Sequence, residues 1–69
     1  MNHYGMTVEW SAEDELFIAR APQFPLLAAH GDTPEEAVRE LGVAMEASLE
    51  IMRETGQKVP EPQPLPRAV

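Results

Sequence analysis

The feature that most constrains this chain is a helix whose beginning and end can both be read from the sequence. Thr33 directly precedes Pro34, and Glu36 follows three residues after Thr33. This pattern is typical of an N-cap hydroxyl that accepts from the Glu36 amide while Glu36 reaches back to the cap, with proline in the first helical position. Gly56 supplies the left-handed cap that commonly ends a helix. The sequence therefore predicts a helix over Pro34–Thr55, roughly 33 Å long at about 1.5 Å per residue.

At about 100° per residue, this helix has two chemically distinct faces. The apolar face carries Ala37, Val38, Leu41, Ala44, Met45, Ser48, Leu49, Ile51 and Met52. The opposite face carries five acids and two small apolar residues: Glu36, Glu40, Val43, Glu46, Ala47, Glu50 and Glu54. We interpret the apolar face as core packing. The acidic face is either a solvated surface or a docking surface for a basic partner.

Three short strands are predicted before the helix. Residues 6–10 alternate between apolar and polar, the pattern of a half-buried strand. Residues 16–21 form a second strand, which the short polar link at 11–15 makes antiparallel to the first. The Pro-Gln-Phe-Pro segment at 22–25 ends that strand, and residues 26–30 are predicted as a third. The expected class is α+β, with a three-stranded antiparallel sheet packed on one long helix in a single domain.

A chain of 69 residues is short for a stable single domain, because such a domain buries only about 60 % of its unfolded surface. Five- or six-residue strands span about 17–20 Å, so the helix should extend roughly 13 Å past its sheet. Leu49, Ile51 and Met52 lie on that extension and need a cover. The proline-rich tail, residues 57–69, is one candidate, and its residues 65–69 could add a short fourth edge strand. The other is a second subunit, so we expect a dimer or tetramer with these three side chains as contacts.

The acidic charge balance narrows the possible partners. Five Lys and Arg against twelve Asp and Glu give a net charge of −7. Direct binding to nucleic acid or to an anionic membrane is not expected, because both need cationic neutralisation. The sequence shows no apolar run of spanning length and no signal-peptide pattern at its start, which favours the cytoplasm. A small basic protein is the partner that this charge suits best.

Candidate catalytic residues are sparse. A metal-dependent nuclease would need clustered carboxylates, and the sequence offers only Asp14 and Asp32 in predicted turns and Glu9 on a strand. His3 and His30 match no zinc-ligand spacing. Trp10 and Phe24 are expected in the core rather than at a binding site, and there is no cysteine. We therefore predict a protein without catalytic activity, metal or cofactor.

The Gly-Asp-Thr-Pro-Glu-Glu-Ala segment at residues 31–37 resembles the N-terminal domain of the HicB-like antitoxin family. The surrounding order is similar as well: an acidic turn between two strands, the segment at 22–25, a long helix, and Val-Pro-Glu-Pro at 59–62. The resemblance covers about residues 4–62. The family usually has glycine where this chain has Glu15 and Leu26. Typical members continue into a DNA-binding domain, whereas this sequence stops at Val69, so repression of an operon is not expected.

This resemblance implies a partial RNase H-like fold of order β-β-β-α-β, with the fourth strand after the helix. It also implies a function, since the family's domain neutralises HicA, a small basic ribonuclease with a double-stranded-RNA-binding-like fold. The acidic helix face would then be the surface that binds the toxin. The alternative is a stand-alone structural or assembly module that has no toxin partner.

Overall fold

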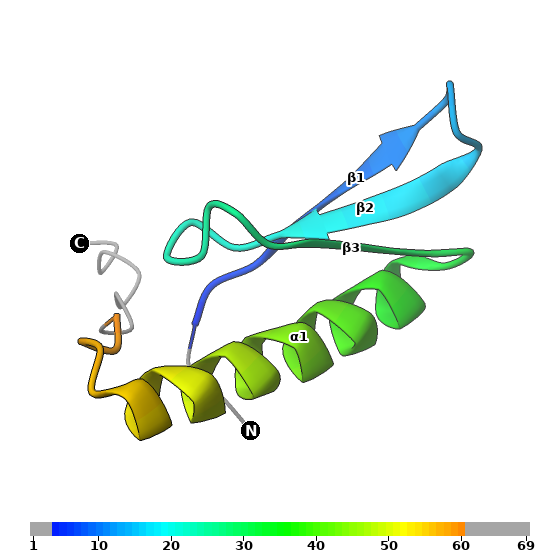
Figure 1. Cartoon of the computed structure of the whole chain (residues 1–69). Helices are drawn as coiled ribbons and strands as arrows, with labels where there is room; N and C mark the ends of the chain where they lie inside the picture. The colour runs from blue at the N-terminus through cyan, green and yellow to red at the C-terminus, as the bar shows by residue number, and fades with distance from the viewer. Residues whose placement is uncertain (1–3, 61–69) are drawn as a thin grey trace, which may run out of the picture.

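The computed structural model describes residues 4–60. It contains β1 (Thr7–Ser11), β2 (Leu16–Arg20), β3 (Ala28–Gly31) and α1 (Pro34–Thr55). The strands form one antiparallel sheet in the order β1-β2-β3, and α1 lies along one face of it (Figure 1). This arrangement confirms the predicted α+β class and the predicted sheet. The fourth strand that the sequence suggested at residues 65–69 lies outside the described residues.

Both ends of α1 are where the sequence predicts them. Thr33 Oγ1 accepts a hydrogen bond from the Glu36 amide at 3.1 Å, which satisfies one of the free donors of the first turn. At the other end, Gly56 has a φ of 74° and its amide donates to the Met52 carbonyl. Glycine suits this left-handed position because it has no Cβ to clash with the chain.

The core lies between α1 and the face of the sheet that it covers. One stripe of the helix is buried: Ala37, Leu41, Met45 and Leu49. On the sheet, the centre of that face is Ala19, which pairs with Val8 on β1 and Ala29 on β3. These small side chains allow the helix to approach the sheet closely.

Helix and sheet approach each other closely at Gly31, the last residue of β3. A Cβ added there would lie 2.6 Å from the Ala37 backbone nitrogen and 2.8 Å from the Glu36 side chain. No real Cβ makes contacts that short, so the start of α1 packs on β3 only because position 31 has no side chain.

The third strand begins two residues later than predicted. The Phe24 amide donates to the Ala21 carbonyl and the Leu27 amide donates to the Phe24 carbonyl, so two consecutive turns occupy residues 21–27. Leu26 therefore points away from the protein and is 97 % exposed, whereas Leu27 packs against the core. Alternation alone could not reveal this, because the turns depend on hydrogen bonds between backbone groups.

Of the two aromatic residues expected in the core, one is buried and the other is largely exposed. Phe24 is buried, with the Tyr4 ring edge-on at 4.9 Å between ring centroids. Trp10 is 55 % exposed, so its predicted burial is wrong. It pairs with Phe17, and its ring rests edge-on against that residue 5.0 Å away. Trp10 lies near the end of the edge strand β1, where the β1–β2 hairpin continues past the last residue of β3.

The strand lengths suggested that the C-terminal part of α1 needs the tail or a second subunit as cover. In the structure, a loop of the same chain also covers it. Leu49 is only 3 % exposed within one chain. The loop at residues 21–27 lies against this part of the helix, and Leu27 and Val59 pack on the same core cluster. Leu49 is therefore nearly enclosed by its own chain, and its predicted role as an oligomer contact stays a prediction. Among the other two predicted contacts, Met52 is half-buried and Ile51 is 57 % exposed.

Candidate functional site

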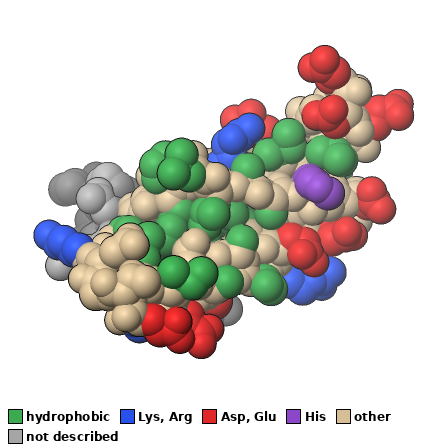
Figure 2. Space-filling model, in the orientation of Figure 1, with side chains coloured by type: hydrophobic (Ala, Val, Ile, Leu, Met, Phe, Trp, Pro, Cys, Tyr) green, Lys and Arg blue, Asp and Glu red, His purple; other side chains and the backbone are tan. Residues whose placement is uncertain are grey.

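The acidic face of α1 is a continuous solvent-facing surface, which we call the acidic ridge. Its members are Glu36, Glu40, Val43, Glu46, Ala47, Glu50 and Glu54. All are exposed except Glu36, which is half-buried beside Gly31. The ridge exists because α1 uses its opposite stripe for the core. Acidic side chains gather over α1 and at the tip of the β1–β2 hairpin (Figure 2). The structure thus brings the predicted ridge residues together on one element.

Two shallow grooves border the acidic ridge. On the β3 side, Glu36 and Glu40 line a depression together with Ala28, Ala29, His30 and Ala44. On the other side, Val43 and Glu46 line a second groove against the N-terminal segment. The part of the ridge from Glu36 to Glu46 is therefore a raised acidic strip with a depression on each flank, a shape that a partner could contact on three sides.

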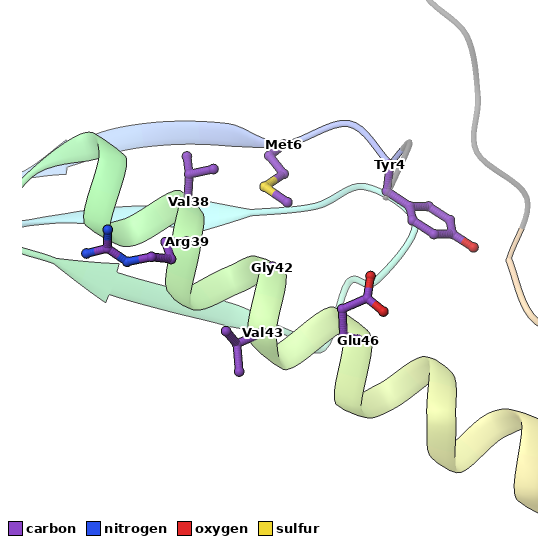
Figure 3. Close-up of a pocket in the computed structure, with 7 residues that line it drawn as sticks. All are labelled: Tyr4, Met6, Val38, Arg39, Gly42, Val43 and Glu46. Carbon is purple, nitrogen blue, oxygen red and sulfur yellow. The ribbon is translucent and has the colours of Figure 1, made fainter. Parts of the chain in front are cut away.

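The second groove is mainly apolar and is open at its floor. Its walls are Tyr4 and Met6 from the N-terminal segment and Val38 and Val43 from α1, with Arg39 and Glu46 at the rim (Figure 3). Gly42 forms the floor, where an added Cβ would have no neighbour within 4 Å. The Tyr4 hydroxyl donates to the Pro60 carbonyl, which ties the start of the chain to the segment after α1. Sequence reasoning missed this groove because Tyr4 and Met6 are far from α1 along the chain.

A further exposed surface is the face of the sheet that α1 does not cover, which we call the open face. It consists of Thr7, Glu9 and Ser11 from β1, Leu16, Ile18 and Arg20 from β2, and Ala28 and His30 from β3, and Asp14 borders it. Ser11, Leu16 and Ile18 are half-buried, and the other members are exposed. The signal in the sequence was that β2 is apolar at consecutive positions, which is typical of a strand with both faces covered.

The acids considered for catalysis are not gathered into one cluster in the part of the chain that the structure describes. The Ser11 hydroxyl donates to the Asp14 carboxylate at 3.2 Å and accepts from the Asp14 amide at 3.3 Å, which closes the turn between β1 and β2. Asp32 lies between β3 and the Thr33 cap. Within residues 4–60, no group of three or more His, Cys, Asp or Glu side chains is arranged to hold a metal ion. His3 lies outside the described residues.

Comparisons with protein-family models, with curated proteins and with solved structures find no match to this chain. In the part of the chain that the structure describes, no helix combines the length and the apolar character of a membrane span.

Proposed function

We propose that this chain is a HicB-like protein without catalytic activity that binds a small basic ribonuclease of the HicA type through the acidic ridge and thereby inhibits it. The observation on which this proposal rests is the acidic surface of α1, which faces solvent and takes no part in the core. Four of its glutamates are exposed, while the other face of the helix is buried in the core. The net charge of −7 supports a basic partner. The proposal includes a partial RNase H-like fold with a fourth strand at residues 65–69, and self-association of the chain.

The spacing of the ridge glutamates supports a binding role over a purely solvating one. Glu46, Glu50 and Glu54 follow one another at i, i+4, so like charges lie side by side along the helix. Each such pair destabilises a helix by about 0.2–0.5 kcal/mol. A cationic partner would relieve this repulsion on binding. Electrostatic attraction would also raise the association rate, by up to two or three orders of magnitude at low salt.

The test is calorimetric binding to a small basic HicA-type ribonuclease, with a ridge variant and a control of the same charge. Glu50→Lys/Glu54→Lys alters the ridge, and Glu13→Lys/Glu15→Lys alters the hairpin tip, so both variants carry the same net charge. We expect the ridge variant to bind at least about tenfold more weakly, or about 1.4 kcal/mol, and the control to bind nearly as well as the unaltered protein. The Glu54→Lys change places a cation near the C-terminus of α1, where positive charge is favourable, so unfolding is not expected.

Two results would contradict the proposal. One is the absence of any salt-sensitive complex between the unaltered protein and such a ribonuclease. The other is equal weakening by both variants, since net charge alone would then explain the attraction.

The alternative is an assembly module without a toxin partner. The observation that favours it is apolar surface away from the ridge, namely Leu26, Ile51 and the open face. A gene for a short basic protein beside the gene for this chain would favour the inhibitor. Ribonuclease activity that remains unchanged when this chain is added in excess would favour the assembly module.

A further inference from the structure

The groove between the N-terminal segment and α1 leaves apolar side chains at the surface. Val38 and Val43 line it from α1 and are 36 % and 63 % exposed. Tyr4 and Met6 form the opposite wall and are half-buried, and Gly42 leaves the floor open between the two walls (Figure 3). We call this hollow the Tyr4 groove. Two exposed valines beside an open floor form a surface that an apolar segment can fill.

One wall of the Tyr4 groove is bonded to the last residue that the structure describes. The Tyr4 hydroxyl donates to the carbonyl of Pro60, which is half-buried. Val59, directly before it, packs against the core. The chain is therefore held beside the groove at Pro60, and residues 61–69 of the sequence follow from that point.

Residues 61–69 are long enough to follow the whole groove. The prolines at 62, 64 and 66 favour polyproline II, in which nine residues span about 28 Å at about 3.1 Å per residue. Along α1 the groove extends from Val38 to Glu46, or about 12 Å at about 1.5 Å per residue. Leu65 comes five residues after Pro60, or about 16 Å in polyproline II. Leu65 is therefore within reach of the groove.

The composition of this segment also matches the groove. Residues 62–66 are Pro-Gln-Pro-Leu-Pro and carry no charge. The two charged residues, Glu61 and Arg67, flank this stretch, so neither has to enter the apolar groove. Polyproline II is already extended before it docks, so it loses little conformational entropy on an aromatic or aliphatic surface.

We propose that residues 61–66 of this chain dock in the Tyr4 groove as polyproline II, with the Leu65 side chain between Met6 and Val38. Met6 directly precedes β1, an edge strand, so the chain can continue from Leu65 along that edge, as the proposed fourth strand requires. The docked segment fills the depression on this flank of the acidic ridge. A ribonuclease would then approach the ridge from its crest and from the β3 side, a consequence that rests on the proposed function.

The chain's own segment suits the groove better than the other possible occupants. Its attachment at Pro60 holds it beside the groove at an effective concentration on the order of millimolar. The same segment of a second copy would bind the same surface without that advantage. A basic ribonuclease would meet Arg39 at the rim of the groove, whereas the acidic ridge presents exposed glutamates.

The experiment is NOE spectroscopy on the isotope-labelled full chain at low and high protein concentration. We expect NOEs from the Leu65 methyl groups and the neighbouring proline rings to the methyl groups of Met6 and Val38 at both concentrations. Leu65→Asp should abolish the proline NOEs, because docking would then bury a carboxylate. Gly42→Leu should abolish them as well, since its side chain occupies the floor of the groove. Leucine is a better helix former than glycine, so α1 should be retained.

Leu26→Asp is the matched control, since it makes the same change at a leucine that is 97 % exposed and lies in the loop at residues 21–27. It should leave the NOEs unchanged, and circular dichroism checks that each variant keeps its helix and sheet. Three outcomes would overturn the proposal. These are the absence of the NOEs in the unaltered protein, their survival in Leu65→Asp or Gly42→Leu, and their loss in Leu26→Asp.

A sample that mixes labelled and unlabelled copies separates the two sources of the segment. NOEs that arise only between copies would overturn the proposal and assign the groove to the tail of a second copy. All of these measurements use the chain without a ribonuclease. Docking in the Tyr4 groove and inhibition through the acidic ridge can therefore fail independently of each other.

Discussion

The two faces of the three-stranded sheet differ in cover. The covered face has Ala19, Ala29 and Gly31 where α1 packs directly on it, and Val8 and Phe17 pack against the same core. The open face has Leu16 and Ile18 beside the charged residues Glu9 and Arg20, and within residues 4–60 nothing packs over them as a second layer. A close-packed layer needs complementary volumes, so the two alanines and the glycine admit the helix of the same chain. The open face instead mixes aliphatic and charged side chains at the surface.

The same comparison separates the surfaces that stabilise the fold from the surfaces that are exposed to partners. The buried stripe of α1 and the covered sheet face hold the fold together. The acidic ridge and the open face hold exposed glutamates and half-buried aliphatic side chains. Substitutions on the first pair of surfaces should therefore change the free energy of unfolding. Substitutions on the second pair should mainly change association.

The largest expected difference is between the same substitution on the two faces. Leu41→Ala removes a fully buried side chain, and we expect a loss of about 2–5 kcal/mol in unfolding free energy. Leu16→Ala removes a half-buried side chain from the open face, and a loss of about 1 kcal/mol or less is expected in the monomer. Urea denaturation of both variants at the same low protein concentration measures both losses. Equal losses would show that the two faces are packed alike.

A second contrast uses two glycines near or within α1. Gly31→Ala places a Cβ against the Ala37 backbone nitrogen, and we expect a loss of about 1–3 kcal/mol from overpacking. Gly42→Ala meets no neighbour within 4 Å, so the higher helix propensity of alanine should raise stability by about 1 kcal/mol. Thermal unfolding should therefore shift in opposite directions, by about 4–8 °C per kcal/mol in a domain of this size. A neutral Gly31→Ala would mean that the helix does not pack this closely on β3.

A third contrast concerns the cap that directs α1 onto the covered face. Thr33→Ala removes the acceptor of the Glu36 amide, and a loss of about 1 kcal/mol is expected. Thr55→Ala is the matched control at the other end, where the exposed hydroxyl donates to the Ile51 carbonyl. The Ile51 carbonyl lies near the exposed end of α1 and can accept from water instead. Loss of the Thr55 bond should therefore change the free energy of unfolding by less than about 0.5 kcal/mol. Equal effects in chemical denaturation would argue against a capping role for Thr33.

The smallest expected effect is a gain in stability on the acidic ridge. Glu50→Lys replaces two like-charge pairs, to Glu46 and to Glu54, with opposite-charge pairs and turns one opposite-charge pair, to Arg53, into a like-charge pair, so stability should rise by a few tenths of a kcal/mol in total. The same variant should bind the basic ribonuclease more weakly. A variant that is both less stable and unchanged in binding would contradict the role assigned to the ridge.

The sequence predicted the elements whose signals are local. The limits of α1 followed from Thr33, Pro34 and Gly56, because caps involve only neighbouring residues. The three strands and their antiparallel order followed from alternation and short links. The late start of β3 was missed because two turns formed by backbone hydrogen bonds place Leu26 in solvent. Propensity and pattern carry no direct information on such bonds.

The remaining differences depend on contacts between distant parts of the chain. The burial of Leu49 depends on the loop at residues 21–27, and the groove beside the acidic ridge depends on Tyr4 and Met6. The exposure of Trp10 depends on its place near the end of the edge strand β1. The acidic ridge itself was predictable, since one helix supplies all of its residues. The open face was not, because an apolar strand does not show which of its faces the helix will cover.

The most direct test of the central claim is an NMR cross-saturation experiment on the labelled chain bound to an unlabelled small basic HicA-type ribonuclease. The claim is that one face of α1 completes the core on the covered face of the sheet and that the acidic ridge binds the partner. It predicts saturation transfer to the methyl groups of Val43 and Ala47, and none to those of Leu41 and Met45. Transfer confined to other surfaces, with none on the acidic ridge, would contradict it.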